Sequence, residues 1–323
     1  MFPPIFQTAI GSLVKAWRIH RYYHGLVRTL VPPIVKLLEE TRQQENVQAE
    51  EQGFFASWWL QEAIHLQNSK AMDPAVLAAI IIQLNFAGLH TTSLTTTNAI
   101  YHILSYKNST LLVEDLLREM AQSSSGVQMG RLTWACLENM TLLDSVVRES
   151  LRCTPIDAVA INRSIVKDVT TPDGLHLTPG TRVCVPGYLA NVDEQHYINA
   201  SIFDPYRFVK SDDSACREKA WAVTDNFTTF GHGLHVSTLA VDHESVFQVL
   251  QSEDTVADQS QLQVCPGRWF AIAEMKLIIV HFLTHYEFES MPSMPEGFCL
   301  ATNLVPSLSH RVRIRGRRNH AQL

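Results

Sequence analysis

Apolar and basic positions alternate at helical spacing over the first 45 residues, as at Trp17, Leu26 and Leu30. Pro32-Pro33 then predicts the start of a further helix, because proline suits the first helical turn. A short amphipathic helix follows over 54–66. The N-terminal region of the chain is therefore expected to be helical.

A much longer helix is predicted from Asp73-Pro74 to about residue 107. Aspartate caps free backbone amides and proline fits the first turn, and no proline interrupts the pattern afterwards. Small residues followed by hydroxyls lie in its middle, at 86–93. Two interpretations are open for this run: close helix packing, or a groove in which something lies against the helix.

Further on, the period changes from helical to alternating. Helices are predicted over 111–121 and 137–152, and from Ile161 the apolar positions recur every second residue around a turn at Pro172-Asp173-Gly174. An apolar helix (271–283) and two closing strands ending near Ile314 come last. We expect a mainly α chain with small β-sheets (α+β). Its regions are a helical region over 1–160 with the long helix 73–107, a β-rich region over 161–210, a loop region with its following helix over 211–283, and C-terminal strands over 284–323.

Composition limits the class of protein. The chain has 323 residues, of which 46% are hydrophobic and 18% charged, and its net charge is −6. This is typical of a soluble globular enzyme and argues against nucleic-acid binding. The basic tail 311–318 alternates with apolar residues, as a solvated edge strand does.

Targeting signals and disulfides are not expected. Six scattered cysteines without a C-x-x-C pair indicate a reducing compartment. The N-terminus lacks the features of a signal peptide, and the most apolar run, 75–84, is shorter than the about 20 residues of a membrane span. The sequence predicts no membrane anchor within this chain.

The strongest candidate for chemistry is Cys265. It stands before Pro266 and Gly267 at the mouth of the apolar helix, where free amides and the helix dipole favour an ionised sulfur. Upstream lies a glycine-spaced turn, Phe-Gly-His-Gly-Leu-His (230–235). If 236–263 are left out, the two pieces join as Phe-Gly-His-Gly-Leu-His-Val-Cys-Pro-Gly-Arg.

The joined string resembles the haem-binding loop of the cytochrome P-450 superfamily, F-x-x-G-x-[RH]-x-C-x-G. Three other stretches match the same family in the right order: Ala-Gly-Leu-His-Thr-Thr (87–92), Glu149-x-x-Arg152, and Phe-Asp-Pro-Tyr-Arg-Phe (203–208). Glu149-x-x-Arg152 alone would suggest only a surface ion pair, but the four together are specific. His90 and the His-x-Cys-Pro-Gly-Arg ending resemble the fungal branch with ent-kaurene oxidases and terpenoid-modifying enzymes.

The resemblance implies a P-450-like fold, of which this chain would hold the C-terminal two-thirds. It also implies roles for individual residues. Cys265 would be the axial thiolate ligand of haem b, which favours O–O cleavage. Thr91 and His90 would handle protons for dioxygen. The other residues that the resemblance assigns are Phe230, Gly233, His235 and Arg163 at the haem, and Glu149, Arg152 and Arg207 in a structural lock behind it.

The implied activity is hydroxylation of a small hydrophobic, terpene-like secondary metabolite. Electrons from NADPH would arrive through NADPH-cytochrome P-450 reductase. The family also implies the endoplasmic reticulum membrane, reached through an N-terminal anchor that this chain lacks. Neither the substrate nor the carbon oxidised follows from the sequence.

Two other functions compete with this one. The chain could be an inactive truncated or mispredicted form of such an enzyme. It could also be a zinc-binding module that uses His232, His235 and Cys265, although no second pair completes a tetrahedral site.

Residues 236–263 are interpreted as a translated intron. The 28 residues preserve the reading frame, open with Val236-Ser237, which a common splice-donor sequence would encode, and close on Gln263, for which a common acceptor end is a codon. The alternative is a tolerated surface loop, since loop-closure entropy grows slowly with length. The intact flanking motif favours the intron.

Overall fold

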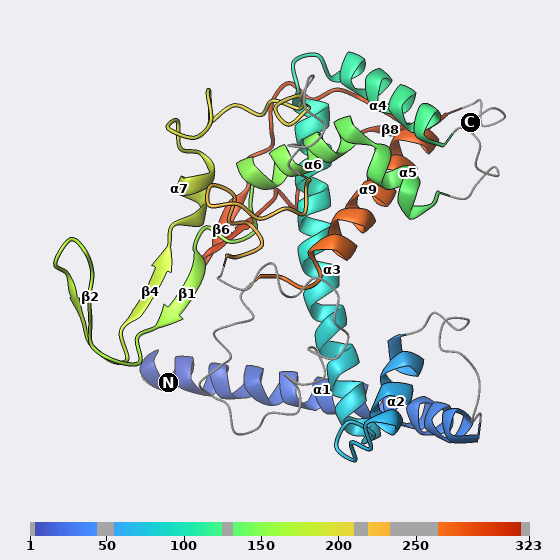
Figure 1. The fold of residues 1–323 in the computed structure, drawn as a ribbon, viewed down its shortest axis with the longest axis vertical. Helices are drawn as coiled ribbons and strands as arrows, with labels where there is room; N and C mark the ends of the chain where they lie inside the picture. The colour runs from blue at the N-terminus through green and yellow to red at the C-terminus, as the bar shows by residue number, and fades with distance from the viewer. Residues whose placement is uncertain (1–3, 44–54, 125–131, 210–218, 233–263, 318–323) are drawn as a thin grey trace. The chain divides into compact units, whose positions relative to one another are not determined.

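A computed structural model describes residues 4–43, 55–124, 132–209, 219–232 and 264–317. It divides into two compact units, residues 1–90 and 91–323. The described chain is mainly α-helical with four small antiparallel sheets, which confirms the predicted fold class (Figure 1).

The first unit contains α1 (Pro4–Gln43) and α2 (Phe55–His65), which pack on each other. The prediction of a new helix at Pro32-Pro33 was wrong, because both prolines lie inside α1. Proline's φ is itself helical, and the apolar spacing continues past the pair to the buried side chains of Ile34 and Leu38. One helix therefore runs through.

The long helix α3 (Pro74–Ser105) begins as predicted. The Asp73 carboxylate accepts a hydrogen bond from the Ala75 amide at 2.8 Å. Phe86 and Leu89 are 68% and 62% exposed, whereas Thr92, Asn98 and Ala99 are buried. The middle of the helix is therefore exposed, and most of its buried residues lie from Thr92 onward.

Among the described residues, α3 is long and apolar enough to cross a membrane, which corrects the expectation drawn from the run 75–84. The core helix of a soluble protein passes the same test. Length and composition therefore do not distinguish a membrane span from a core helix here.

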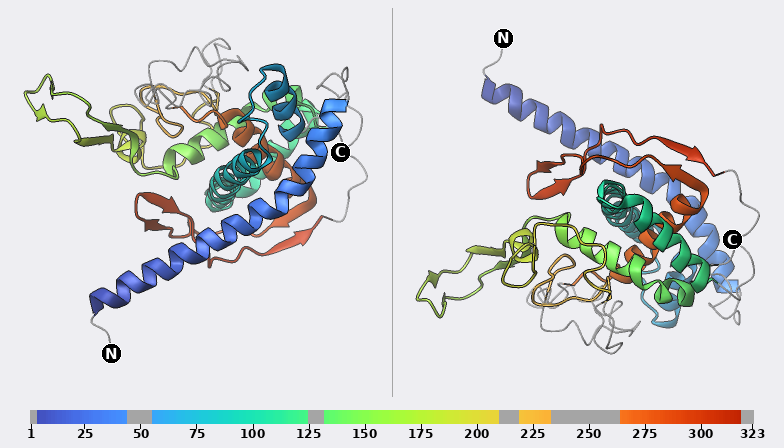
Figure 2. Two further views of the ribbon diagram at one scale, coloured as in Figure 1. Left: turned by 90° about the horizontal axis from the view of Figure 1, so that it is seen from below. Right: turned by 90° about the horizontal axis from the view of Figure 1, so that it is seen from above.

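The core of the second unit lies where α3 meets four other helices. These are α4 (Ser109–Ser123), α5 (Trp134–Asn139), α6 (Thr141–Cys153) and α9 (Arg268–His285). Buried residues from all five helices form one apolar cluster. Figure 2 shows α3 end-on with α4 and α9 beside it. This packing fixes the helices that carry the site.

The predicted helix 137–152 is divided in two at Met140, which has φ −77° and ψ +88°. The break places the start of α6 against Glu119 of α4. The carboxylate of Glu119 accepts hydrogen bonds from the amides of Leu142 and Leu143, at 2.6 and 2.9 Å. A side chain from another helix thus caps α6, and that contact has no signature in the local sequence.

The β-structure consists of two-stranded antiparallel sheets. β1 (Ala160–Ser164) pairs with β4 (Arg182–Val185), and β2 (Val169–Thr170) pairs with β3 (His176–Leu177) around a turn in which Gly174 has φ +89°. The short helix α7 (Gly187–Asn191) follows. The end of the chain carries four short strands instead of the predicted two: β5 (Tyr286–Phe288), β6 (Phe298–Leu300), β7 (Asn303–Val305) and β8 (Ile314–Gly316).

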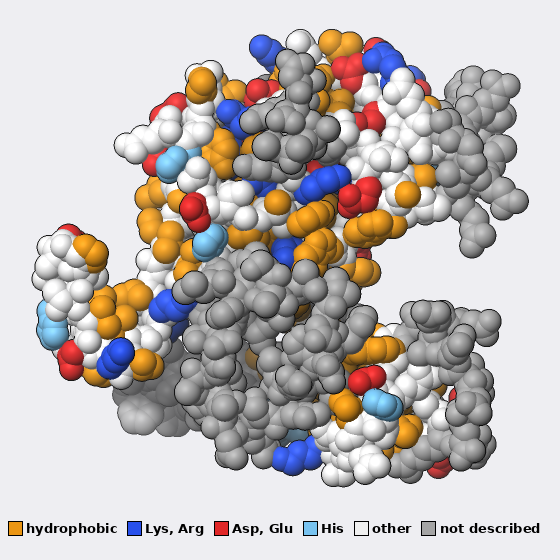
Figure 3. Space-filling model, viewed as in Figure 1, with side chains coloured by type: hydrophobic (Ala, Val, Ile, Leu, Met, Phe, Trp, Pro, Cys, Tyr) orange, Lys and Arg blue, Asp and Glu red, His pale blue; other side chains and the backbone are white. Residues whose placement is uncertain are grey.

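Charged side chains on the described surface are of both signs. On the face drawn in Figure 3, acidic and basic side chains are interspersed. Within the basic tail, 314–316 form the exposed strand β8, which pairs with β5, and Arg315 of this strand contacts Glu287. This part of the tail therefore belongs to a small sheet, as the alternating pattern predicted.

Candidate functional site

A cavity of about 310 Å³ lies in the second unit, where α3, α6, α7, β1 and the start of α9 meet. Its walls carry mostly apolar atoms, together with threonines from α3 and from 228–229 and the Cys265 thiol. The lining residues are Thr91, Thr92, Thr95, Leu151, Pro155, Ile156, Asp157, Val159, Ala160, Ile161, Asn162, Gly187, Asn191, Thr228, Thr229, Phe230, Gly231, Cys265, Ala271 and Met275.

Cys265 is presented by a turn that leads directly into α9. Its amide donates to the carbonyl of Phe230 at 2.8 Å, so the two predicted pieces of the loop are hydrogen-bonded to each other. Its own carbonyl accepts from the Arg268 side chain at 3.0 Å. A Cβ built on Gly267 would lie 3.9 Å from the Cys265 sulfur, so the turn passes close to the thiol.

Three threonines of α3 line the cavity together with Cys265. Thr95 Oγ1 donates to the carbonyl of Thr91 at 2.8 Å and contacts Met275 Sδ of α9 at 3.5 Å. A hydroxyl that bonds one turn back occupies a carbonyl of its own helix. The structure thus brings Thr91 and Cys265, 174 residues apart in the sequence, to one cavity.

The other predicted cofactor contacts lie at or beside this cavity where they are described. Phe230 lines it and packs edge-to-face with Phe227. Arg163 of β1 donates to the carbonyl of His232 at 3.1 Å, and burial lowers the pKa of its guanidinium. Arg163 thus holds the turn that carries Phe230. Gly233 and His235 lie outside the described residues, as does the segment 236–263.

His90 precedes Thr91 on α3 but belongs to the first unit and does not line the cavity. Its ring is exposed and packs edge-to-face on Phe86, with centroids 5.0 Å apart. The structure therefore gives His90 an aromatic neighbour on its own helix.

Glu149, Arg152 and Arg207 form one buried cluster, which we call the carboxylate lock. Glu149 and Arg152 are fully buried, and two hydrogen bonds of 2.8 and 2.7 Å join them. Arg207 Nε donates to Glu149 at 2.9 Å. Burial alone would lower the pKa of Arg152, but the hydrogen bonds with Glu149 carry it above its ordinary value. The interpretation as a surface ion pair is wrong.

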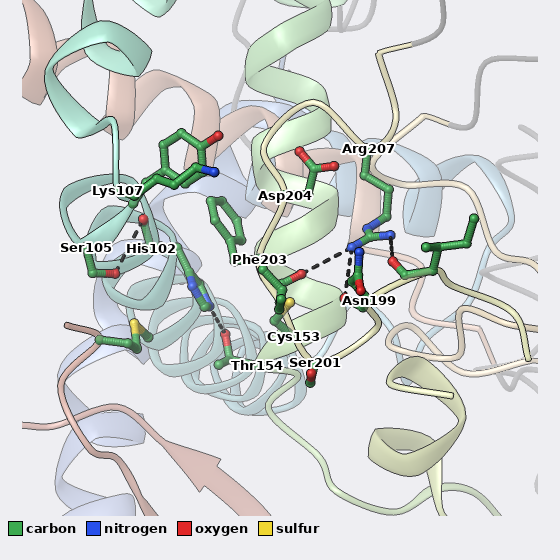
Figure 4. A pocket seen from close by; sticks show the side chains of 14 residues that line it. His102, Ser105, Lys107, Cys153, Thr154, Asn199, Ser201, Phe203, Asp204 and Arg207 are labelled. Atoms are coloured by element: carbon green, nitrogen blue, oxygen red, sulfur yellow. Dashed lines mark hydrogen bonds between the residues drawn. The ribbon is translucent and has the colours of Figure 1, made fainter. Parts of the chain in front are cut away.

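The lock also orders the backbone around it. Arg152 donates to the carbonyls of Asn191 and Ala200, at 2.8 and 2.6 Å. Arg207 donates to the carbonyl of Ile198 at 2.7 Å, and Figure 4 shows its guanidinium reaching toward Asn199. Asn191 also lines the cavity. The lock is thereby linked to the cavity wall.

A second and larger cavity, of about 820 Å³, opens on the outer side of the lock. His102 lies at its edge, stacked on Phe203 with centroids 4.5 Å apart and 3.3 Å from the Thr154 hydroxyl (Figure 4). None of the predicted catalytic or cofactor-binding residues lines it. The smaller cavity is therefore the better candidate for the functional site.

Several buried polar residues were missed by sequence reasoning. Arg148 is fully buried, donates to the carbonyls of Lys219 and Ala222, and stacks over Phe227. Asp144 and Lys276 form a buried ion pair. A charged residue within an apolar helix was the available signal for Lys276, but its partner could not be found from spacing.

The comparison with known proteins decides the family. The cytochrome P450 family model matches residues 4–236, well over half of the chain. The chain belongs to the cytochrome P450 family. The family match ends before Cys265 and at the first residue of the segment interpreted as an intron.

Similar cytochromes P450 come from fungi. Cytochrome P450 monooxygenase 110 of Postia placenta is 26% identical over 325 residues, covering 99% of this chain and 57% of the relative. Cytochrome P450 monooxygenase ntnM of a Nectria species is 30% identical over 264 residues, covering 79% and 43%. The chain thus spans about half the length of the curated relatives it matches.

Cytochromes P450 imply a haem cofactor, and the cavity has features that fit one. It offers a cysteine sulfur, the donor that haem iron takes in this family. The Thr228 hydroxyl in its wall is buried and makes no hydrogen bond to the described residues.

The zinc alternative finds no cluster of ligands in the described part of the chain, where no three His, Cys, Asp or Glu side chains gather to hold a metal ion. His232 instead pairs with Asp225 at 3.0 Å.

Removing the lock carboxylate should destabilise the protein strongly. Glu149→Ala leaves the guanidinium of Arg152 buried without its partner, and we expect a loss of about 3–5 kcal/mol in the free energy of unfolding. Glu289→Ala removes an exposed pair with Arg313 and should cost at most about 1 kcal/mol. Urea unfolding measures both, and a Glu149→Ala midpoint equal to that of the control would contradict a buried lock.

Acid should destabilise the protein through His102. Burial lowers the pKa of its imidazole to about 4. The unfolded chain takes up this proton below about pH 6.5, so the free energy of unfolding should fall on the order of 3 kcal/mol between pH 6.5 and 4. His102→Gln should flatten this dependence and the exposed His196→Gln should not. If the free energy of unfolding depended on pH identically in all three proteins, the effect could not be assigned to His102.

Proposed function

We propose that this chain carries the haem-binding and dioxygen-activating region of a monooxygenase that oxidises a small hydrophobic, terpene-like molecule. The single observation that carries the proposal is the cavity in which Cys265 and Thr91 meet. The relatives whose names contain "monooxygenase" support the reaction class.

Haem b, when bound through a cysteine thiolate, supplies the redox chemistry that activates dioxygen and inserts an oxygen atom into a C–H bond. The protein's contribution is to place the sulfur. Cys265 stands three residues before the first residue of α9, in the turn that leads into that helix. Phe230 and Ala271 beside it present apolar surface.

Thr91 is proposed to hold and deliver a proton on the opposite wall. Thr91 lines the cavity from α3 together with Thr92 and Thr95, and its backbone carbonyl accepts a hydrogen bond from the Thr95 hydroxyl. A hydroxyl donates and accepts hydrogen bonds, so it can pass a proton to dioxygen held in the cavity. His90, one residue earlier on α3, is proposed to exchange that proton with solvent, because its ring is exposed.

The substrate is proposed to be apolar because of what lines the cavity. Leu151, Ile156, Val159 and Ile161 offer aliphatic surface, which selects for hydrophobic ligands. Electrons are proposed to come from NADPH through NADPH-cytochrome P450 reductase, and the location is proposed to be the endoplasmic reticulum membrane, with which the family is often associated. The terpenoid class rests on the motif resemblance alone.

A second candidate is that the chain as translated is inactive. It is favoured by the end of the family match at residue 236, where the loop that should reach Cys265 is interrupted. We keep the proposal that 236–263 are a translated intron.

Haem binding tests the function and the segment together. The full chain and a variant lacking 236–263 are expressed with haem, reduced and exposed to carbon monoxide. We expect the red-shifted Soret band of a thiolate-bound haem in the deletion variant only. Cys265→Ala should abolish the band, whereas the exposed Cys299→Ala should retain it.

Each outcome decides something. The same band in both proteins would make 236–263 a genuine loop. No band in either protein would count against the proposed function.

Thr91→Ala should uncouple oxygen use from product formation in the haem-loaded protein. Loss of a positioned proton donor should lower product formed per electron by roughly tenfold or more and raise peroxide release. Thr97→Ala on the same helix, whose hydroxyl bonds the Ser93 carbonyl, is the matched control.

His90→Ala should change the pH profile of turnover. Unchanged coupling in Thr91→Ala, or an unchanged profile in His90→Ala, removes the respective residue from the proton path.

A further inference from the structure

A buried ion pair joins α6 to α9 outside all four sequence motifs. Asp144 of α6 and Lys276 of α9 are in ion-pair contact, with their side chains 2% and 4% exposed. Lys276 Nζ also donates to the carbonyl of Leu137 at 3.0 Å, and the Ala220 amide donates to the other oxygen of Asp144 at 2.9 Å. Each charged side chain is therefore also hydrogen-bonded to a backbone group of a third segment, Lys276 at 137 and Asp144 at 220.

Stability alone is a poor explanation for such a pair. Desolvation of two charges offsets much of their attraction, and apolar residues of similar volume often serve as well. Where buried ion pairs have a distinct role, they fix the register of one element on another. The apolar residues of the same core, which include Val147, Ile279 and Val280, make non-directional contacts that tolerate a small slide.

The position of α9 matters because the cysteine turn and the cavity-lining Met275 both precede Lys276 along the chain and move with this helix. The helix begins three residues after Cys265, and Lys276 lies about 12 Å further along it at 1.5 Å per residue. Met275, adjacent to Lys276, lines the cavity and contacts Thr95 of α3. A slide or rotation of α9 would move the cysteine turn and the Met275 wall together.

Asp144 lies on the helix that also carries the carboxylate lock. Glu149 follows it by five residues, and Leu151 of the same helix lines the cavity. The pair therefore connects the helix that holds the lock to the helix that leads from Cys265.

We propose that Asp144 and Lys276 are a positioning pair that sets the axial placement of α9, and thereby the place of the Cys265 sulfur in the cavity. The pair touches neither substrate nor cofactor in this role. The inference rests on the proposed function for its spectroscopic test, but its first test needs no haem.

The test variant is Asp144→Asn/Lys276→Met in the full chain. The introduced asparagine keeps an acceptor for the Ala220 amide, the introduced methionine fills the volume of the lysine stem, and no unpaired charge is left buried. Hydrogen exchange is followed in peptides covering 264–272, where the amides of Cys265 and Ala271 are bonded to the carbonyls of Phe230 and Gly267. Lys219→Met, which breaks a nearby half-exposed pair with Glu138, is the control.

We expect the double variant to keep the wild-type urea midpoint while the 264–272 amides exchange at least tenfold faster, and the control to exchange at the wild-type rate. If the double variant does not fold, Asp144→Asn/Lys276→Leu, which also leaves no unpaired charge buried, carries the same comparison. Wild-type exchange in a folded variant would overturn the proposal and leave the pair a purely structural one.

A second measurement uses haem-loaded protein that lacks 236–263, into which the same substitutions are introduced. The thiolate Soret band of the carbon monoxide complex should be lost or halved in the double variant and retained in the control. If the protein lacking 236–263 binds no haem even without these substitutions, the proposed function is contradicted and the exchange result decides the positioning role.

Discussion

The second unit depends on the buried ion pairs that the carboxylate of Glu149 makes. This carboxylate sits fully buried between Arg152 and Arg207 and also accepts a hydrogen bond from the Asp204 amide. Two guanidinium groups then distribute the remaining donors over backbone carbonyls from residue 191 to 202. A charge that would be costly to bury alone thus becomes the centre around which an irregular segment is ordered. Few other interactions could hold so much non-repetitive backbone in one place.

The candidate site takes its geometry from elements that this cluster helps to hold. One wall is the hydroxyl-bearing turn of α3, another is the start of α9, and the third is formed by β1, α7 and the turn at Phe230. None of these elements forms a cavity by itself. The chemistry proposed for Cys265 and Thr91 requires them to keep their separation across packed helices, so under this proposal a small displacement of α9 would change function as well as structure.

The chain also contains a conflict between motif and connectivity. The flanks of 236–263, when joined, resemble a cytochrome P450 cysteine loop, and the amide of Cys265 donates to the carbonyl of Phe230 on the other side of that segment. The family match ends where the segment begins. The chain belongs to the family, while the proposed activity rests on how the two ends of the segment are joined.

The sequence by itself determined the mainly α fold class, the start of α3 at Asp73-Pro74, and the four motifs that contain Thr91, Glu149, Arg152, Arg207 and Cys265, because capping, periodicity and motif spacing are local. It failed where local rules were overridden: the prolines inside α1, the division at Met140, and the four closing strands. Only the tertiary structure decided that Glu149 is buried, that Glu119 caps α6, and that Asp144 meets Lys276. The burial of Glu149 and the pairing of Asp144 with Lys276, 132 residues further on, depend on packing between helices. No local sequence pattern encodes which distant side chain packs against a given residue.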